Sequence, residues 1–418
     1  GVDIRIAGTR IEEVGQALTP RDGDAKRDMK GMVVMPGLVC GHNHFYSGLA
    51  RGITANIPAS TDFVSNLTHL WWRLDRALDE QSLYYSGIIC CLEAIKAGCT
   101  SVVDHHASPS FIFGSLDVLK GCFEESGLRG VECYETTDRN GTAGWKEGVE
   151  ENRRFAELIM TEKTSESRLV ESMIGGHAPF TLSDDGLRAL GDLVESSGKG
   201  FHIHVSEDRF DPSFSHRYND TEPLRRLADY GLVTGNSLIA HGIYLNADDR
   251  ALLNTSGATL AHNCRSNMNN SVGYNEHLGE LHSVCIGTDG IGADVLEELK
   301  FAYFKHRDSN GSLGPSDYVG YLQNGNRVIG RCFDDKFGRI KEGYKADLTV
   351  LDYLAPTPML EENLAGHVLF GMSSRNVHSV LVNGEYVLEA GGFTKPINDL
   401  YARARDAAKK LWENMDTL

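Results

Sequence analysis

The stretch VVMPGLVCGHNH, Val33–His44, is an almost continuously apolar run that ends on two histidines separated by one residue. Apolar runs that end on small or polar residues recur along the chain as far as Asp289. Runs of this kind are typical of parallel strands that are covered on both faces. The predicted strands are Val33–His44, Thr100–His106, Gly130–Glu135, Leu169–His177, Gly200–Glu207, Ser237–His241, Ala258–His262 and Val284–Asp289.

Helix-like segments separate these strands, and two of the segments carry boundary signals. Ser183 is predicted to cap a helix over 184–197 that stops at Gly198, and Asp220 to cap a helix that runs to Tyr230. Strands that alternate with helices predict a parallel sheet, and eight such repeats predict a closed barrel. The expected fold class is therefore α/β, a (β/α)8 barrel of the TIM type.

The two ends of the chain differ from this pattern. Short strands are predicted at 2–6 and 9–15, and again at 346–352 and 379–388, where Asn-Gly marks a tight hairpin turn. We therefore expect residues 1–35 and 338–418 to form a small β-sandwich domain with an amphipathic C-terminal helix. Residues 36–337 are expected to form the barrel domain.

Composition excludes several classes of protein. The 418 residues carry a net charge of −17, so the basic face that a nucleic-acid binder needs is not expected. No apolar run approaches the ~20 residues of a membrane-spanning helix, so we expect no membrane partner. The nine cysteines show no regular spacing and no Cys-x-x-Cys. Such thiols fit a reducing compartment, so a cytoplasmic location is expected.

Histidines gather at the carboxyl ends of the predicted strands, where barrel enzymes carry their functional groups. His42 and His44 share one strand face, and so do His202 and His204. Each pair could supply nitrogen ligands to a metal ion or could simply close a strand. Only one histidine of the second pair need be a ligand, and we favour His204 because it lies nearer the strand end.

Carboxylates lie at two of the same ends. Glu207 follows the fifth strand, where a general base and acid could reach a water molecule activated by a metal ion. Asp289 ends the eighth strand, and a buried carboxylate there would need a partner such as a metal ion. His241, at the end of the sixth strand, could be an ordinary polar group, a ligand or a group that orients water. His105 could contact substrate or merely end the second strand.

Four segments, taken together, resemble the amidohydrolase superfamily. MPGLVCGHNH at 35–44 resembles its first-strand motif, and HIHVSE at 202–207, AHG at 240–242 and GTDG at 287–290 resemble later motifs in the same order. The chain is most similar to the cytosine/guanine deaminase and chlorohydrolase branch. HNHFYS and TDGIGAD look especially like the SsnA group of aminohydrolases. The resemblance covers essentially the whole chain.

The resemblance implies one divalent metal ion, Zn²⁺ with Fe²⁺ as the alternative. The implied ligands are His42, His44, His204 and Asp289. Glu207 and His241 would act on water and substrate, with Asp289 as a second proton acceptor, and His177 would bind substrate. The segment NCRSN at 263–267 lacks the proline that many members of the branch carry, and it adds Arg265 as a predicted substrate contact.

The predicted reaction is hydrolytic deamination of a small, purine- or pyrimidine-like N-heterocycle by a metal-bound hydroxide. One alternative is ring-opening hydrolysis of a cyclic amide or ureide at a single metal. Two-metal cyclic amidases usually bridge their metals with a lysine of the fourth strand, and Leu169–His177 contains no lysine. A further alternative is an inactive metal-binding scaffold. A homodimer is the default expectation for an enzyme of this size.

Overall fold

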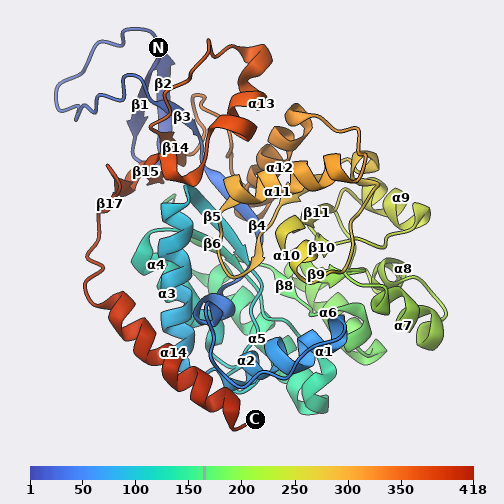
Figure 1. The fold of residues 1–418 in the computed structure, drawn as a ribbon. Coiled ribbons are helices and arrows are strands. Elements are labelled where there is room, and N and C mark those ends of the chain that lie inside the picture. Colours follow the sequence, from blue (N-terminus) through green and yellow to red (C-terminus); the bar gives the residue numbers. More distant parts are fainter. Residues whose placement is uncertain (163–165) are drawn as a thin grey trace.

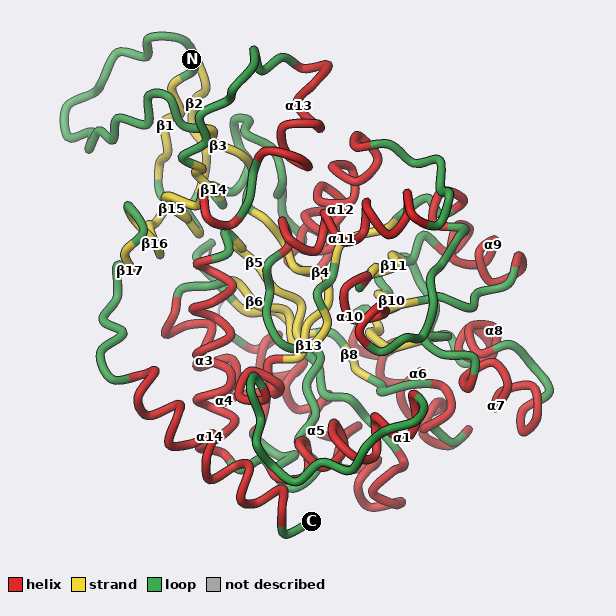
Figure 2. Tube along the Cα trace, in the orientation of Figure 1, coloured by secondary structure: helices red, strands yellow, loops and turns green. Residues whose placement is uncertain are grey.

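The computed structural model describes residues 1–162 and 166–418. Strands gather at the centre of the molecule and helices surround them (Figure 2). Two parallel five-stranded sheets, in the orders β13-β4-β5-β6-β7 and β8-β9-β10-β11-β12, form the central layer. The uninterrupted barrel strands are β4 (Leu38–His44), β5 (Cys99–Asp104), β6 (Arg129–Glu132), β9 (Phe201–Val205), β10 (Leu238–His241) and β11 (Thr259–His262).

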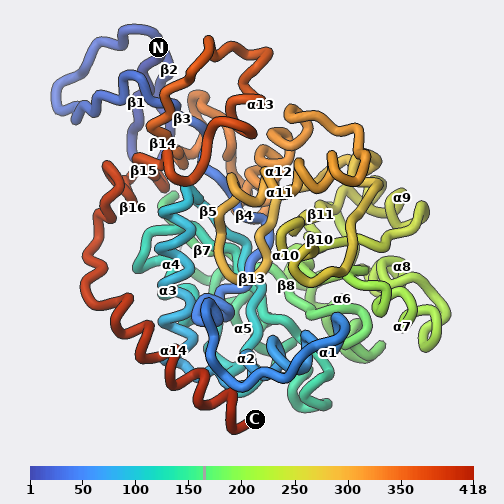
Figure 3. Tube along the Cα trace, in the orientation of Figure 1, coloured from blue at the N-terminus to red at the C-terminus, as the bar shows by residue number. Residues whose placement is uncertain are grey.

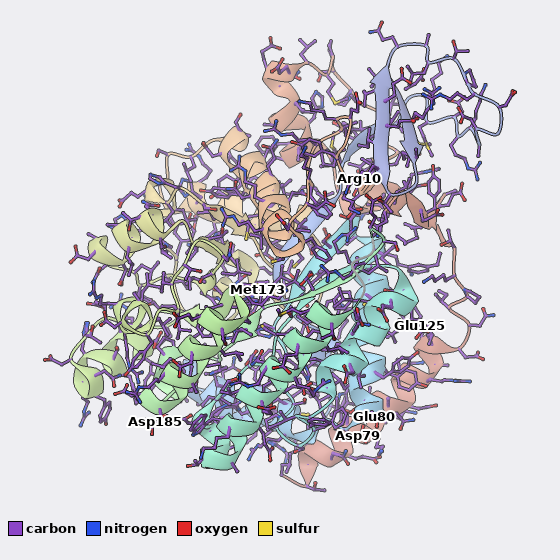
Figure 4. The ribbon with its side chains drawn as sticks, turned by 180° about the vertical axis from the view of Figure 1, so that it is seen from behind. Arg10, Asp79, Glu80, Glu125, Met173 and Asp185 are labelled. Atoms are coloured by element: carbon purple, nitrogen blue, oxygen red, sulfur yellow. The ribbon has the colours of Figure 1, made fainter. Side chains whose placement is uncertain are left out.

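The fourth and eighth barrel strands each pass from one sheet to the other, and this closes the barrel. The fourth consists of β7 (Val170–Ser172) and β8 (Ile174–Gly175), and the eighth of β12 (Val284–Ile286) and β13 (Asp289–Gly290). At the first crossing the Met173 amide donates to the Glu132 carbonyl (2.9 Å); Met173 is labelled in Figure 4. At the second, the Thr288 amide donates to the His42 carbonyl (3.0 Å). The predicted (β/α)8 barrel is confirmed.

Helices cover the outside of the barrel (Figure 1). They are α3 (Glu80–Lys96), α4 (Ser115–Ser126), α5 (Gly141–Thr161), α6 (Asp184–Ser197), α7 (Phe210–Asn219), α8 (Pro223–Asp229), α9 (Ala247–Ser256), α10 (Cys264–Asn269), α11 (Val295–Asp308) and α12 (Pro315–Phe333). An excursion after β4 contains α1 (Phe63–Asn66), a π-helical turn (Leu67–Trp71) and α2 (Trp72–Ala77).

The predicted cap at Ser183 is confirmed, because its hydroxyl accepts from the Gly186 amide (3.3 Å) and Gly198 ends the helix with φ of 67°. The prediction for Asp220 is wrong. Asp220 adopts a left-handed conformation (φ 53°) and ends α7, and α8 begins only at Pro223. Proline supplies no amide hydrogen and has a fixed φ, so it is well suited to start a helix.

The first predicted strand, Val33–His44, is in fact two strands. β3 (Val33–Pro36) pairs antiparallel with β14 (Leu348–Leu351), whereas β4 enters the barrel. The break falls at Gly37, where a Cβ atom would lie 2.1 Å from the Thr100 hydroxyl oxygen. Only glycine lets the backbone pass Thr100 this closely.

The small β-structure draws on both ends of the chain, and Figure 3 shows the blue N-terminal strands beside the orange and red C-terminal ones. Its sheet has the order β3-β14-β15-β16-β17, and the hairpin β1-β2 lies against it. The remaining strands are β1 (Asp3–Ala7), β2 (Arg10–Gly15), β15 (Val377–Val382), β16 (Glu385–Glu389) and β17 (Gly392–Phe393). As predicted, Asn383 and Gly384 form the hairpin turn, with φ of 51° and 79°.

Helix α14 (Leu400–Asp416) returns over the barrel, where the Trp412 indole donates to the Leu49 carbonyl (3.0 Å). The short α13 (Leu364–Gly366) lies beside α12. Arg10, labelled in Figure 4, joins the hairpin to the residues after α12 through two 2.8 Å hydrogen bonds to Asp335. Among the described residues, no helix combines the length and the apolarity that crossing a bilayer requires.

Arg129 joins the barrel to the small β-sheet, and its replacement by lysine is expected to destabilise the protein. The fully buried guanidinium donates to Asp347 (2.9 Å) and to the Asn383 side-chain oxygen (2.6 Å), and it stacks over Phe333 and Phe337. Lysine keeps the charge but cannot reproduce the planar fork. We expect Arg129→Lys to lower the free energy of unfolding by about 1–3 kcal/mol in denaturant titrations.

The matched control is Arg225→Lys, at an exposed ion pair with Asp229 on α8. An exposed pair of this kind contributes about 1 kcal/mol or less. Equal losses in the two variants would contradict the role assigned to Arg129.

Candidate functional site

The four predicted metal ligands converge at the carboxyl ends of β4, β9 and the eighth barrel strand. His44 Nε2 lies 2.9 Å from Asp289 Oδ1 and 3.1 Å from His204 Nε2. His42 Nε2 lies 3.3 Å from the same Asp289 oxygen. A tetrahedral zinc site with bonds of ~2.1 Å has ligand–ligand distances of ~3.4 Å. The donor set and its spacing therefore fit one divalent cation.

The imidazole hydrogen bonds indicate which nitrogens are free. His44 Nδ1 lies 2.7 Å from the His105 carbonyl, and His204 Nδ1 lies 2.8 Å from the His177 carbonyl. A carbonyl can only accept, so each Nδ1 carries a proton and each Nε2 of a neutral ring presents a lone pair. Two lone pairs 3.1 Å apart repel each other, so a proton or a metal ion must lie between them. In the metal-free site the carboxylates of Asp289 and Glu135 outweigh burial and hold the pKa of His44 well above its usual value, and a metal ion would take the place of that proton. Backbone contacts of this kind orient metal-binding histidines.

His42 faces the same point and is held from behind by His202. His42 Nδ1 lies 2.9 Å from His202 Nε2, whereas His42 Nε2 is buried with no hydrogen-bond partner among the described residues. Burial lowers the pKa of His42 to about 3 and that of His204 well below its usual value. Neutral imidazole is the form that binds a metal ion.

Asp289 is the anionic member of the group. Burial alone would raise its pKa, but the adjacent imidazoles of His42 and His44 hold the pKa of Asp289 well below its usual range. Its other carboxylate oxygen accepts a short hydrogen bond from Ser266. A carboxylate that is ionised at neutral pH and three imidazoles together form a donor set that Zn²⁺ accepts.

Glu207 and His241 lie next to this group as a pair. His241 Nε2 is 3.6 Å from Glu207 Oε2, and His241 Nδ1 contacts the Asn267 side-chain oxygen at 2.8 Å. The amide oxygen accepts, so in the neutral ring His241 keeps its proton on Nδ1. Burial raises the pKa of Glu207 to about 7. A carboxyl group that changes protonation near neutral pH is suited to both accept and donate a proton.

The backbone is strained where these side chains leave the barrel. Ser206, His241 and Asp289 all adopt left-handed conformations, with φ of 53°, 70° and 58°. Residues other than glycine rarely adopt such φ values, and the residues that do are concentrated at functional sites. Three of them, at the carboxyl ends of the fifth, sixth and eighth barrel strands, mark this rim of the barrel as the functional one.

A cavity that opens to solvent adjoins the group. His44, His204, Glu207 and Asp289 all line this cavity. His177 lies in its wall, with its ring centre 5.4 Å from that of His204. Three predicted ligands, Glu207 and His177 thus face one cavity, whereas His42 and His241 do not line it.

Two predicted substrate contacts, His105 and Arg265, do not line the cavity. His105 is fully buried and stacks on His202 with ring centres 4.3 Å apart. The Arg265 guanidinium donates to the backbone carbonyls of Thr288 (2.7 Å) and Gly290 (3.1 Å). Both residues support the site from outside the cavity.

The cavity also has polar residues that were not among the predicted site residues. Glu135, after β6, lies 3.1 Å from His44 Nδ1. Asp75 and Arg139 form an ion pair of 2.7 Å, and the Arg139 guanidinium lies over the Trp72 ring. Asp75 Oδ1, Arg139 Nε and Trp72 Nε1 are buried without hydrogen-bond partners in the described chain. Glu135 is the last residue of a predicted strand, and that position is the feature of the sequence that could have identified it as a site residue.

Asp211, in the cavity wall, is expected to make stability depend on pH. Its side chain accepts from the Ser206 amide (2.7 Å), and burial raises its pKa to about 7. The unfolded chain releases this proton near the ordinary value of ~3.9. Because the folded state retains the proton, the stability that Asp211 supplies is present below about pH 4 and is lost as the pH rises to about 7.

Asp211→Asn removes this titration. Denaturant titrations of the metal-free protein at about pH 5 and about pH 8 should show a smaller loss of stability in the variant than in the wild type. Other buried acids contribute equally to both proteins, so the difference isolates Asp211. Parallel losses would contradict the expectation.

Comparison with known proteins places the chain in a family. The model of the amidohydrolase family matches residues 33–387. A 5-methylthioadenosine/S-adenosylhomocysteine deaminase of Thermococcus onnurineus is 30% identical, over 92% of this chain and 89% of the relative. A 5'-deoxyadenosine deaminase of Methanopyrus kandleri is 28% identical, over 87% of this chain and 83% of the relative. These relatives agree with the predicted deaminase branch.

The crystal structure of an adenosine deaminase from Xanthomonas campestris with bound zinc superimposes with a TM-score of 0.83. The alignment covers 98% of this chain and 93% of that one at 19% identity. At this identity the likeness concerns the fold alone. The family match spans the barrel strands and most of the small β-sheet. The chain belongs to the amidohydrolase family.

Proposed function

We propose that this protein is a metal-dependent aminohydrolase that removes an amino group from a purine-like heterocycle. The observation that carries the proposal is the convergence of three imidazole nitrogens and the Asp289 carboxylate beneath a cavity that Glu207 also lines. The named relatives that deaminate adenosine derivatives support the same reaction class.

We propose Zn²⁺ as the metal ion, held by His42, His44, His204 and Asp289. Three nitrogens and one carboxylate oxygen near tetrahedral spacing suit zinc, and iron stays the alternative. When bound there, the ion would lower the pKa of a water molecule to ~7 and so supply a nucleophile near neutral pH.

The proposed proton movements use Asp289 and Glu207, which line the cavity, and His241, which lies beside Glu207. Asp289 or Glu207 accepts the proton of the attacking water, and Glu207 then passes a proton to the ring nitrogen next to the reacting carbon. His241, fixed by Asn267, donates toward the oxygen that develops negative charge when its Nε2 is protonated. The proton of the newly added hydroxyl group then passes through Asp289 or Glu207 to the amino group, so that the C–N bond breaks, ammonia leaves and a carbonyl group forms. The pKa of Glu207, about 7, lets one carboxyl group both accept and return the proton.

We propose an adenosine-like nucleoside as the substrate class. A nucleoside has a ring to be deaminated and a sugar that carries hydroxyl groups. Asp75, Arg139 and Trp72 line the cavity, and each has a buried polar atom without a partner in the described chain, one acceptor and two donors in all. A buried polar atom without a partner is costly, and a hydroxyl group can both donate and accept. This wall therefore suits the polar part of such a substrate.

The test is ammonia release by zinc-loaded protein from adenosine, 5'-deoxyadenosine, 5-methylthioadenosine, S-adenosylhomocysteine, adenine, guanine and cytosine. Release from the nucleosides but not from free adenine supports both the reaction and the substrate class. Release from a free base alone would contradict the nucleoside proposal. No ammonia from any compound, with zinc bound, would contradict the deaminase and favour ring opening, which loss of ring absorbance would detect.

We further propose that residues 36–337 form the catalytic domain and that residues 1–35 and 338–418 form the small β-domain. The pairing of β3 with β14, followed by entry of β4 into the barrel, supports the first boundary. We propose a cytosolic location because all nine cysteines are free thiols.

A further inference from the structure

The loop that carries Asp289 is held from behind by α10. Arg265 Nη2 donates to the carbonyls of Thr288 (2.7 Å) and Gly290 (3.1 Å), which flank Asp289 on both sides. The next residue, Ser266, donates to the Asp289 carboxylate oxygen that faces away from His42 and His44. One guanidinium nitrogen thus fixes both peptide planes around the proposed ligand.

The loop requires such support because its backbone is strained. Asp289 and Ile291 have φ of 58° and 60°, a region that residues other than glycine rarely adopt. Such conformations persist only where the surroundings enforce them. The two hydrogen bonds from Arg265 are charge-assisted, and they act on the carbonyls whose direction depends on this backbone.

Arg265 is itself immobilised. Its amide donates to Glu298 Oε1 (2.7 Å), and its Nε lies 3.4 Å from Glu298 Oε2. Glu298 is buried on α11. The opposite side of Arg265 faces a surface groove that Arg51, Asp294 and Arg375 also line, and its side chain is 29% exposed there. Small solutes can therefore reach the guanidinium position from solvent without entering the substrate cavity.

We propose that Arg265 is a positioning residue, which keeps the Asp289 carboxylate aimed at His42 and His44 and does not contact substrate. The inference rests on the proposed role of Asp289 as a metal ligand. It assigns to Arg265 a function that its place in the sequence did not indicate. Groups that orient metal ligands typically change metal affinity or activity by ~10–100-fold when they are removed.

The experiment compares Arg265→Ala, Arg265→Lys and Arg375→Ala. Zinc affinity is measured by competition with a chelator, and kcat and KM are measured with the nucleoside that the wild type deaminates. Arg265→Ala should bind zinc ~10–100-fold more weakly and lose kcat by a similar factor with little change in KM. Lysine should not restore either quantity, because an ammonium group cannot bridge both carbonyls in the plane. Arg375→Ala, in the same groove, should behave as the wild type.

Chemical rescue separates positioning from general damage. Millimolar guanidinium chloride should restore zinc affinity and kcat in Arg265→Ala but not in Arg375→Ala or the wild type, and ammonium chloride at the same concentration should not. A lower melting temperature of the metal-free variant with unchanged zinc affinity would overturn the proposal, and so would a loss that guanidinium leaves in place. A raised KM at normal zinc affinity would instead make Arg265 a substrate contact. The zinc measurement needs no substrate, so it remains decisive even if the proposed deamination fails.

Discussion

Glu207→Gln is expected to lower kcat by about 10²–10⁴-fold while the bound metal stays in place. Glutamine has nearly the same shape as glutamate but cannot accept and return a proton. Glu207 lies beside His241, 3.6 Å away, and is not one of the four proposed ligands. Since the lost step is proton transfer, KM should change much less than kcat. Ammonia release and zinc content measured on the same sample check both parts.

The control is Glu195→Gln, the same chemical change at an exposed position of α6. It should leave kcat and zinc content at wild-type values. Full activity in Glu207→Gln with zinc bound would exclude Glu207 as the proton carrier. Loss of zinc together with activity would instead place Glu207 among the ligands.

The barrel and the convergence of the predicted ligands at one rim were predictable because both follow from periodicity. Alternate residues of a strand share a face, so His42 and His44 had to point the same way, and strand ends of a parallel barrel share one rim. The same reasoning favoured His204 over His202. In the structure His204 Nε2 lies 3.1 Å from His44 Nε2, and His202 contacts His42 Nδ1 from behind.

Other features depend on contacts between residues that are distant in sequence. The division of Val33–His44 into two strands follows from the approach of Gly37 to Thr100, and apolar residues continue through the break. Arg265 was predicted to reach substrate, but a side chain's direction depends on its partners, here the carbonyls of Thr288 and Gly290. Periodicity carries no information about such contacts.

The contacts in the cavity wall were likewise not predictable from the sequence. Asp75 lies on a helical excursion between two barrel strands, and Arg139 follows the third barrel strand. Nothing in the spacing of 64 residues between them predicts their 2.7 Å ion pair. Loops that form a substrate pocket are placed by tertiary packing, so the reaction class was predictable from the strand ends and the substrate was not.

Asp289→Asn is expected to lower both zinc affinity and activity severely, with activity falling by at least ~10³-fold. A neutral amide removes the anionic member of the donor set, whose charge the adjacent imidazoles of His42 and His44 favour. Loss of a bound divalent ion removes several kcal/mol of transition-state stabilisation, and each ~1.4 kcal/mol is tenfold in rate. Zinc content after dialysis and ammonia release check the two quantities.

The reference for Asp289→Asn is wild-type protein from which a chelator has removed the metal. Wild-type protein stripped of metal should recover full activity when zinc is added back, whereas Asp289→Asn should recover it only in part, at high zinc. Asp192→Asn, on the exposed side of α6, is the matched control and should retain its zinc. An Asp289→Asn protein that holds zinc as tightly as the wild type but is inactive would restrict Asp289 to proton transfer. The remaining histidines would then have to bind the ion, with His241 as the nearest additional donor, since it forms a compact group with His42, His204 and Asp289.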